Sequence, residues 1–259
     1  MTSSFESPKD KLFAAKRILC VQPHYDDNDL GAGALLAMLA DRGCELIYLT
    51  VTDDLMGVLD VTLSPDQAKK RLRNEQIQAG HWIGVREHFW LDYPDAGEYP
   101  YYSLRREVIR FIRWLKPDYL LTCDPWLPYE AHRDHIQTGM AVAEAAILYN
   151  LPRLKTEEKI DGIYQPYPLQ GVIFTFTHQP NVIVDVTQTY QRKLHAIRCY
   201  QSQFTPPDME AMICFLENNE RQNPEDTPAV YAESFRVMSP QQLHINTKGI
   251  ILNGQRKDT

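Results

Sequence analysis

Short apolar runs alternate with longer helical stretches over the first 150 residues of the chain. Runs such as RILCVQ have the length and composition of buried strands, whereas stretches such as LGAGALLAMLAD have the composition of helices. We predict strands at residues 17–22, 45–52, 88–91 and 118–123, and helices at 30–41, 64–84, 103–116 and 135–150. Strands that alternate with helices in this way indicate βαβ units and a parallel sheet.

The alternation changes after about Asn150. Residues 151–170 are polar and contain several prolines, and we predict a loop there. The pattern beyond this loop predicts strands at 171–177 and 181–187 and a helix at 188–203. From Phe204 onward the pattern is mixed and supports no assignment.

No linker, internal repeat or low-complexity segment divides the chain, and 259 residues are enough to bury one large core. We therefore predict a single domain over residues 1–259, with a core at about 17–150 and a C-terminal α+β elaboration at about 151–259. The predicted fold class is α/β: a Rossmann-like, largely parallel sheet with helices on both faces.

Composition and charge argue against some classes of function. The formal net charge is −7 and no basic tract is present, so we expect no nucleic-acid partner. No apolar stretch reaches the roughly 18 residues of a membrane span, and the N-terminus lacks a signal-peptide region, so we expect no membrane partner and a cytoplasmic location. The five cysteines are scattered and form no CxxC pair, which is typical of free thiols and argues against a thiolate zinc site.

A polar cluster stands where the first predicted strand ends, in the stretch VQPHYDDNDLGAG. It contains His24, Asp26, Asp27 and Asp29. Aspartates at a helix N-terminus cap free N–H groups, which accounts for one or two carboxylates but not for three beside a histidine. Like charges this close repel unless a positive charge lies among them, so the cluster indicates a bound cation.

The same stretch offers a second interpretation, because GAG resembles part of a dinucleotide-binding turn. The full GxGxxG pattern would require glycine at position 36, where the chain has Leu36. The neighbouring aspartates would also repel a pyrophosphate. We therefore disfavour a dinucleotide site.

A second cluster, in EAHRDHIQTG, follows the strand predicted at 118–123. His132, Asp134 and His135 lie there within four residues. Parallel strands bring their carboxyl ends to one edge of a sheet, so the two clusters are expected at the same edge. A catalytic zinc ion commonly takes three ligands from His, Asp and Glu and keeps one position for water.

The pair PHYDD and AHRDH resembles the paired motifs PHPDD and HPDH of the PIG-L/LmbE-like zinc-dependent de-N-acetylases. DPWLPYEAHRDH, THQPNVIVDVT, KLHAIRCYQSQF and ESFRVM resemble segments of the archaeal diacetylchitobiose deacetylases in that family, and the resemblance covers most of residues 17–245. It implies a hydrolase that removes acetyl from an N-acetylglucosaminyl substrate and gives acetate and a free amine. Diacetylchitobiose or a related chitooligosaccharide is the leading substrate.

The resemblance assigns roles to the two clusters. His24, Asp27 and His135 are implied to hold one zinc ion per chain, or another divalent metal. Asp26 is implied to be the general base, a role typically worth roughly 10²–10⁴-fold in rate. His132 is implied to assist at the tetrahedral intermediate. The carboxylate of Asp134 would orient it.

The resemblance also implies contacts with the sugar and between subunits. Asp95, in LDYPDAGEY, occupies the position of a sugar-contacting aspartate. Archaeal members assemble as hexamers in which a histidine near one C-terminus approaches a neighbouring site, and His244 in QQLHI is the corresponding candidate. We therefore expect a homo-oligomer, with a hexamer as the leading size.

Some positions depart from the family pattern. Leu72 stands where related enzymes carry a substrate-binding arginine. Arg71 and Arg73 flank it, each about 100° away around a helix, so either could replace it, the substrate could differ, or both could belong to a solvated face. Tyr25 and Asn28 replace the usual proline and a frequent acidic residue, and neither is a proposed ligand.

Aromatic residues in the loops at the predicted edge are further candidates, because sugar rings stack on aromatic faces: Tyr93, Tyr101, Trp126 and Tyr129. We predict sugar contacts for Trp126 and Tyr129, with plain packing as the alternative. Two other functions stay open. The chain could deacetylate another GlcNAc conjugate, such as a glycolipid or a thiol precursor, or it could be a catalytically silent sugar-binding relative.

Overall fold

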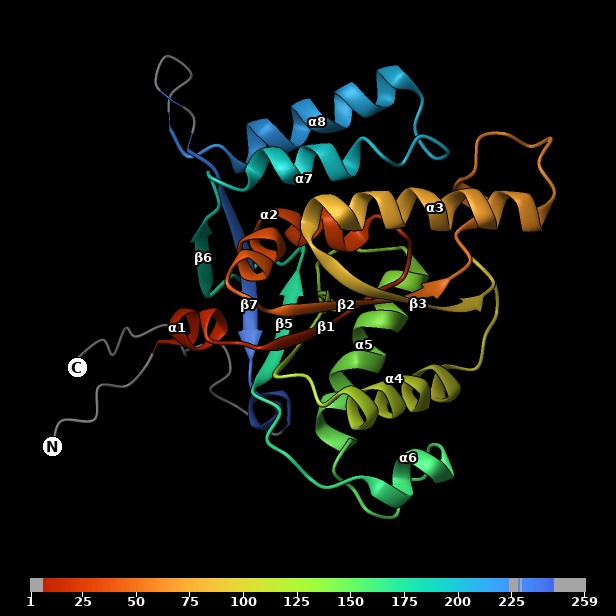
Figure 1. Ribbon diagram of the computed structural model, residues 1–259, viewed down its shortest axis with the longest axis vertical. Coiled ribbons are helices and arrows are strands. Elements are labelled where there is room, and N and C mark those ends of the chain that lie inside the picture. Colours follow the sequence, from red (N-terminus) through yellow and green to blue (C-terminus); the bar gives the residue numbers. More distant parts are fainter. Residues whose placement is uncertain (1–6, 224–227, 229, 245–259) are drawn as a thin grey trace, which may run out of the picture.

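A seven-stranded sheet forms the centre of the protein in the computed structural model, which describes residues 7–223, 228 and 230–244. The strand order is β3-β2-β1-β4-β5-β7-β6 (Figure 1). The strands are β1 (Arg17–Gln22), β2 (Glu45–Thr52), β3 (Val85–Tyr93), β4 (Tyr119–Cys123), β5 (Gly171–Thr175), β6 (Val182–Asp185) and β7 (Ala232–Met238). The first five strands of that order are parallel, and β7 runs antiparallel to both β5 and β6.

Helices cover both faces of the sheet (Figure 1). α2, α3 and α7 pack together on one face with α8 beyond them, and α4 and α5 pack together on the other. The helices are α1 (Pro8–Phe13), α2 (Asp27–Asp41), α3 (Pro65–Ile83), α4 (Tyr101–Leu115), α5 (Arg133–Leu148), α6 (Glu158–Ile163), α7 (Tyr190–Ile197) and α8 (Pro206–Glu220), with short 3₁₀ turns η1 (Leu55–Gly57) and η2 (Pro240–Leu243). The buried apolar side chains form one cluster on each face.

Local sequence signals explain these elements. β2 and β4 are buried along nearly their whole length, as expected of strands in a parallel sheet that is covered on both faces. α3 begins at a capping box between Ser64 and Gln67 with Pro65 in the first turn. It ends at Gly84, whose φ of 95° suits a residue without a Cβ.

The predicted α/β class with a largely parallel sheet is confirmed, and several element predictions are corrected. α2 begins at Asp27, three residues before the predicted start at Leu30. The predicted loop at 151–170 contains α6, which is held because Asp161 pairs with Arg113 and accepts hydrogen bonds from Thr156. The unassigned tail contributes α8 and the antiparallel strand β7.

Two findings bear on the expectations from composition. No helix in the described ranges is long and apolar enough to cross a membrane. All five cysteines are free, and Cys20, Cys44 and Cys123 are buried.

Candidate active site

The turn between β1 and α2 places the first polar cluster at the carboxyl end of β1. His24, Asp26 and Asp27 are buried there, with exposed fractions of 8%, 7% and 6%. Asp27 accepts a hydrogen bond from the backbone N–H of His24 at 2.8 Å. Asp26 is the residue before the helix, yet its side chain makes no capping hydrogen bond. Helix capping therefore does not explain Asp26.

Asp27 lies between two histidines. One of its oxygens is 3.2 Å from Nδ1 of His24, and the other is 3.3 Å from Nε2 of His135 in the first turn of α5. The three side chains offer ligand atoms that all lie within 4.8 Å of one another. Two ligand atoms bound to one tetrahedral zinc ion are about 3.3 Å apart, given bonds of about 2.0 Å. The three residues predicted as metal ligands thus come together at suitable separations.

Carboxylates also face the far side of both imidazoles. Oε2 of Glu130 is 3.5 Å from Nδ1 of His135, and Oε1 of Glu130 accepts the backbone N–H of His132 at 2.7 Å. Oδ1 of Asp95 is 3.3 Å from Nε2 of His24. Carboxylates beyond a ligating histidine fix its ring and tautomer in metal sites, so Glu130 and Asp95 fit this role.

Replacing Glu130 by glutamine is expected to lower the affinity for a divalent metal roughly 10- to 100-fold. The amide keeps the size of the side chain but removes the charge beside His135. Chelator competition on metal-depleted protein would measure the change. Glu158→Gln, an exposed glutamate on α6, is the matched control and should bind as the wild type does. Equal affinity of Glu130→Gln and wild type would contradict the assignment.

A second group of possible ligands shares His24 and adds Asp95, His132 and Asp134. Asp134 is held by the backbone N–H of Ala96 and the hydroxyl of Tyr99, each at 2.9 Å. Its carboxylate is 3.9 Å from Nδ1 of His132, which is too long for a hydrogen bond. The contact through which Asp134 was expected to orient His132 is therefore a distant one.

The imidazole of His132 itself lies beside the proposed ligands. Its ring centre is 4.6 Å from that of His24 and 5.0 Å from that of His135. Its side chain is 45% exposed, in contrast to that of His24. It can therefore face a molecule that approaches from solvent.

The electrostatics differ between the two adjacent aspartates. Burial and then the charge of Asp27 raise the pKa of Asp26 well above its usual range. Burial also acts on Asp27, but the hydrogen bond with His24 and the charge of His135 outweigh it and lower its pKa to about 2. Burial lowers the pKa of His24, yet the carboxylates of Asp134, Asp27 and Asp95 raise it well above 6.5. The site thus has an excess of carboxylates that a cation would offset.

The peptide before Asp26 is fixed by hydrogen bonds on both sides. The carbonyl of Tyr25 accepts from Nε2 of Gln22 at 3.1 Å, Nε2 of Gln76 at 2.9 Å and the hydroxyl of Tyr200 at 2.9 Å. The N–H of Tyr25 donates to Asp54 at 3.0 Å. These bonds position the turn that carries the cluster.

Asp29, the third aspartate of the motif, has a structural environment. It is fully buried and accepts hydrogen bonds from the hydroxyls of Tyr48 at 2.7 Å and Tyr200 at 2.5 Å. Burial raises the pKa of Asp29 to about 6. It ties α2 to β2 and to the end of α7.

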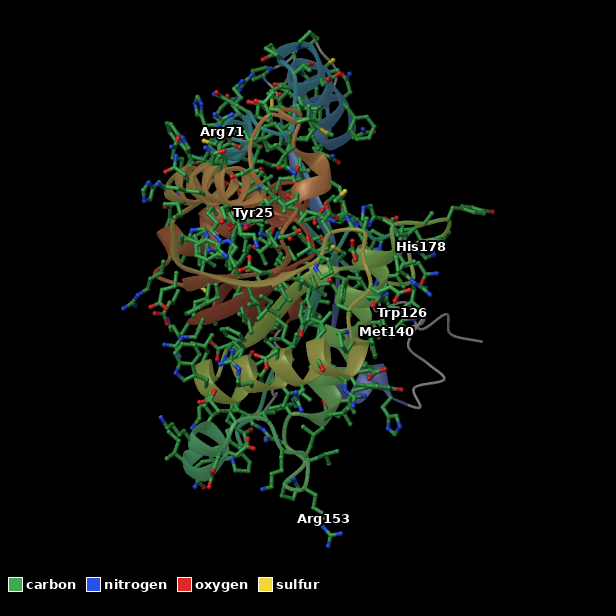
Figure 2. The ribbon with its side chains drawn as sticks, turned by 90° about the vertical axis from the view of Figure 1, so that its right-hand side faces the viewer. Tyr25, Arg71, Trp126, Met140, Arg153 and His178 are labelled. Carbon is green, nitrogen blue, oxygen red and sulfur yellow. The ribbon has the colours of Figure 1, made fainter. Side chains whose placement is uncertain are left out.

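The two predicted sugar-binding arginines pair with aspartates that belong to neither group of possible metal ligands. Arg73 forms a bidentate pair with Asp92 at 2.6 and 2.7 Å, and its guanidinium lies 4.7 Å from the ring of Trp90. Arg71 is exposed and 3.9 Å from Asp60. Figure 2 shows Arg71 on the opposite side of Tyr25 from Trp126. Leu72 is fully buried, and the replacement of the expected arginine by Arg71 or Arg73 stays a prediction.

The remaining sugar-binding candidates differ in exposure. Trp126 is half-exposed and Tyr129 is fully exposed, both on the loop between β4 and α5. His244 is exposed just after η2. Their contacts with a sugar or with a neighbouring subunit stay predictions.

Several site residues were missed by sequence reasoning. Glu130 and Asp54 carried a usable signal, because they stand in or beside polar clusters that follow strands at the same edge. Gln76 and Tyr200 carried none, because they reach Tyr25 from positions 51 and 175 residues away in the sequence.

Comparison with known proteins identifies the family. A model of the GlcNAc-PI de-N-acetylases (PIG-L) matches residues 19–146. The chain is also 34% identical to the diacetylchitobiose deacetylase of Thermococcus kodakarensis over 231 residues, which cover 89% of this chain and 86% of that protein. The chain belongs to the PIG-L de-N-acetylase family. The resemblance and the amide-hydrolase class predicted from the sequence are confirmed.

Other similarities extend to solved structures and other curated relatives. The N,N'-diacetylchitobiose deacetylase of Pyrococcus horikoshii, solved with its inhibitor, matches with a TM-score of 0.84 and 34% identity over 93% of this chain and 90% of that one. A probable N-acetyl-α-D-glucosaminyl L-malate deacetylase of Bacillus anthracis is 26% identical over 73% of this chain and 82% of its own. A hydratase from Pseudomonas putida matches with a TM-score of 0.68 at 19% identity over 86% of this chain and 96% of its own, so it shares the fold alone.

Proposed function

We propose that the protein uses a bound zinc ion to hydrolyse the acetamide group of an N-acetylglucosaminyl sugar, giving acetate and a free amine. Diacetylchitobiose or a related chitooligosaccharide is the proposed substrate. One observation carries the proposal: Asp26 is a buried carboxylate that neither caps the helix nor belongs to the adjacent ligand group of His24, Asp27 and His135. Family membership gives the reaction class.

The donor set suits zinc. Two imidazole nitrogens and one carboxylate match the three protein ligands of many catalytic zinc sites, although iron(II) or cobalt accept the same donors. A bound zinc ion supplies a Lewis acid for the acetyl carbonyl and a water of low pKa. The separations around Asp27 support this choice.

The chain's own residues supply the proton transfers. In this proposal Asp26 accepts the proton of the attacking water and passes it to the leaving amine. His132 is half-exposed beside His24, which supports the proposal that it donates a hydrogen bond to the oxygen that becomes negative. Asp134 lies too far from this ring to be its only support, so its proposed role is to hold the loop at Ala96 and Tyr99.

The choice of a chitooligosaccharide over other GlcNAc conjugates rests on relative similarity. The chain is 34% identical to an enzyme named for diacetylchitobiose, and 26% identical to one named for a glucosaminyl malate. Acetate release over a panel of GlcNAc derivatives would test this choice. Zinc-loaded protein should contain one metal ion per chain and prefer the disaccharide. No acetate release from any derivative would contradict the proposed reaction.

We also propose that the chain is a single domain and forms a homo-oligomer, with a hexamer as the leading size. We further propose that the protein is located in the cytoplasm. His244 is exposed, as a contact with a neighbouring subunit requires. Light scattering at several concentrations would test the homo-oligomer, and cell fractionation would test the location. A fully active monomer would contradict the homo-oligomer.

A further inference from the structure

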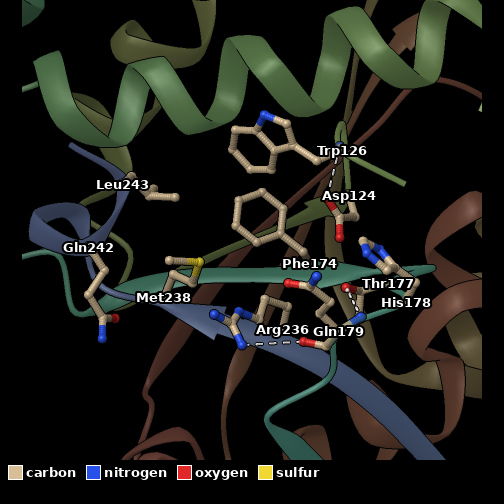
Figure 3. Close-up of a pocket in the computed structure, with 10 residues that line it drawn as sticks. All are labelled: Asp124, Trp126, Phe174, Thr177, His178, Gln179, Arg236, Met238, Gln242 and Leu243. Atoms are coloured by element: carbon tan, nitrogen blue, oxygen red, sulfur yellow. Dashed lines mark hydrogen bonds between the residues drawn. The ribbon is translucent and has the colours of Figure 1, made fainter. Parts of the chain in front are cut away.

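A cavity of about 250 Å³ lies near the loops that follow β4 and β5 (Figure 3). It opens between the loop after β4, the loop after β5, and the end of β7 with η2. Its lining residues are Asp124, Trp126, Phe174, Thr177, His178, Gln179, Arg236, Met238, Gln242 and Leu243. None of the proposed metal ligands lines it, so the cavity is distinct from the metal cluster.

Two of its walls continue into the metal cluster. The loop that begins with Asp124 and Trp126 ends at His132 and leads into the first turn of α5, which holds His135. On the other wall, the ring of Phe176 lies 6.5 Å from the ring of His135. Thr177, which lines the cavity, follows Phe176 directly, so their Cα atoms are about 3.8 Å apart. The cavity wall and the metal cluster are therefore connected through adjacent residues on both sides.

Trp126 presents an aromatic surface to this cavity. Its indole meets Phe174 edge to face, with ring centres 5.6 Å apart, and Phe174 is fully buried. The backbone N–H of Trp126 donates to Asp124 at 2.9 Å, which fixes the start of the loop. Its side chain is nevertheless 49% exposed. A rigid aromatic face of this kind binds a flat apolar ligand surface at low cost in conformational entropy.

Polar groups of opposite charge surround that aromatic surface. Figure 3 shows Asp124 and His178 at one end of the cavity and Arg236 opposite the ring of Phe174. Arg236 donates to the carbonyl of Gln179 at 3.4 Å, which ties β7 to the loop after β5. A few polar groups around an apolar surface fix the orientation of a ligand, and these groups can hydrogen-bond to the hydroxyl groups of a neutral ligand.

We propose that this cavity binds the sugar ring linked to the one that loses its acetyl group. The inference rests on the proposed function, because it assigns a second subsite to the same substrate. A pyranose has an apolar face for Trp126 and hydroxyl groups for the polar rim. A volume of about 250 Å³ lies just below the usual range for drug-sized ligands, so it suits one ring.

Binding of sugars to the metal-free full chain tests the assignment without relying on turnover. Titration calorimetry should show that N,N'-diacetylchitobiose binds at least about 10-fold more tightly than N-acetylglucosamine. Trp126→Ala should reduce this preference, the ratio of the affinity for the disaccharide to that for the monosaccharide, about 3- to 10-fold, which corresponds to the usual free energy of an aromatic contact. His178→Ala, at an exposed position, should reduce it in the same direction without disturbing the core.

Trp114→Ala is the matched control. Trp114 is 47% exposed and also packs against phenylalanines, but it lies at the end of α4, away from this cavity. Its variant should keep the full preference for the disaccharide. Equal affinity of the wild type for both sugars, or a preference unchanged in both cavity variants, would overturn the assignment.

Two further outcomes separate the possible explanations. If Trp126→Ala changes the oligomeric state by light scattering and leaves sugar binding intact, the cavity holds a neighbouring subunit and the assignment is overturned. If the preference for the disaccharide follows the prediction but the zinc-loaded protein releases no acetate, the subsite is supported and the proposed reaction fails.

Discussion

Replacement of Asp26 by asparagine is expected to lower turnover roughly 10²–10⁴-fold while the metal stays bound. Asparagine keeps the shape of the side chain but cannot accept a proton at neutral pH. Asp26 does not belong to the ligand group of His24, Asp27 and His135, so no metal bond is lost. KM should change little, because proton transfer stabilises the transition state and not the bound amide.

Asp27→Asn is the matched comparison, since it makes the same chemical change one residue later. Here a carboxylate that faces both His24 and His135 becomes a neutral amide, so metal affinity should fall. Metal content and turnover should be measured together on both variants. If helix capping were the only role of these residues, the variants would behave alike and lose at most about 1–2 kcal/mol of stability. Equal metal loss in both, or near-normal turnover of Asp26→Asn, would refute the assigned roles.

The meeting of the two motifs could be predicted from the sequence because it follows from topology. His24 and His135 are far apart along the chain, but each follows a parallel strand, and β1 and β4 are neighbours in the sheet. Parallel strands bring their carboxyl ends to one edge, so the loops after them converge. The alternation of apolar runs and helices was sufficient for this inference.

Other parts of the site depend on contacts that have no local signature. Tyr200 reaches the carbonyl of Tyr25 only because α7 packs on α2, and nothing in the sequence around Tyr200 indicates that contact. Asp29 looked like a member of the cation cluster, but it lies two positions after Asp27 on α2, about 200° around the helix, and its side chain faces Tyr48. The order of strands and helices in the sequence predicts the edge of the sheet at which a residue lies, whereas the direction of its side chain depends on packing.

In the C-terminal part, whole strands and helices also depend on contacts that the local sequence does not indicate. β7 lies between β5 and β6, so a late segment completes a sheet that earlier segments begin. Residues 158–163 form a helix within a polar stretch because Arg113 of α4 anchors Asp161. Tertiary contacts of this kind override a local pattern that predicts a loop.

A buried charge network joins α7, α8 and β7 to α2. Lys193 is fully buried, and its Nζ lies 2.6 Å from Glu220 and 2.8 Å from Glu233. Glu233 is also buried and accepts the backbone N–H groups of Ala34 at 3.2 Å and Leu35 at 2.7 Å in α2. The helix that carries Asp27 is therefore attached to β7 through a carboxylate that Lys193 neutralises.

Lys193→Met is expected to lower the free energy of unfolding by about 3–5 kcal/mol at pH 7, because the carboxylate of Glu233 loses its counter-charge inside the protein. Removing both charges in Lys193→Met/Glu233→Gln should restore part of the loss. Lys70→Met, at an exposed lysine of α3, should stay within about 0.5 kcal/mol of the wild type. Urea unfolding of the full chain would measure all three variants.

The pH dependence of the same variant gives a second test. Burial raises the pKa of Glu233 above its usual range, although the charge of Lys193 opposes this. Without Lys193 the pKa rises further, so the folded variant binds a proton more tightly than the unfolded chain does. The proton on Glu233 stabilises the folded variant fully below the pKa of this group in the unfolded chain, about 4.3. This stabilisation is lost as the pH rises through the pKa of the group in the folded state. The difference in the free energy of unfolding between wild type and Lys193→Met should therefore become smaller as the pH is lowered from 7 to 5. A difference that is constant over this range, or below about 1 kcal/mol at pH 7, would show that Glu233 does not depend on Lys193.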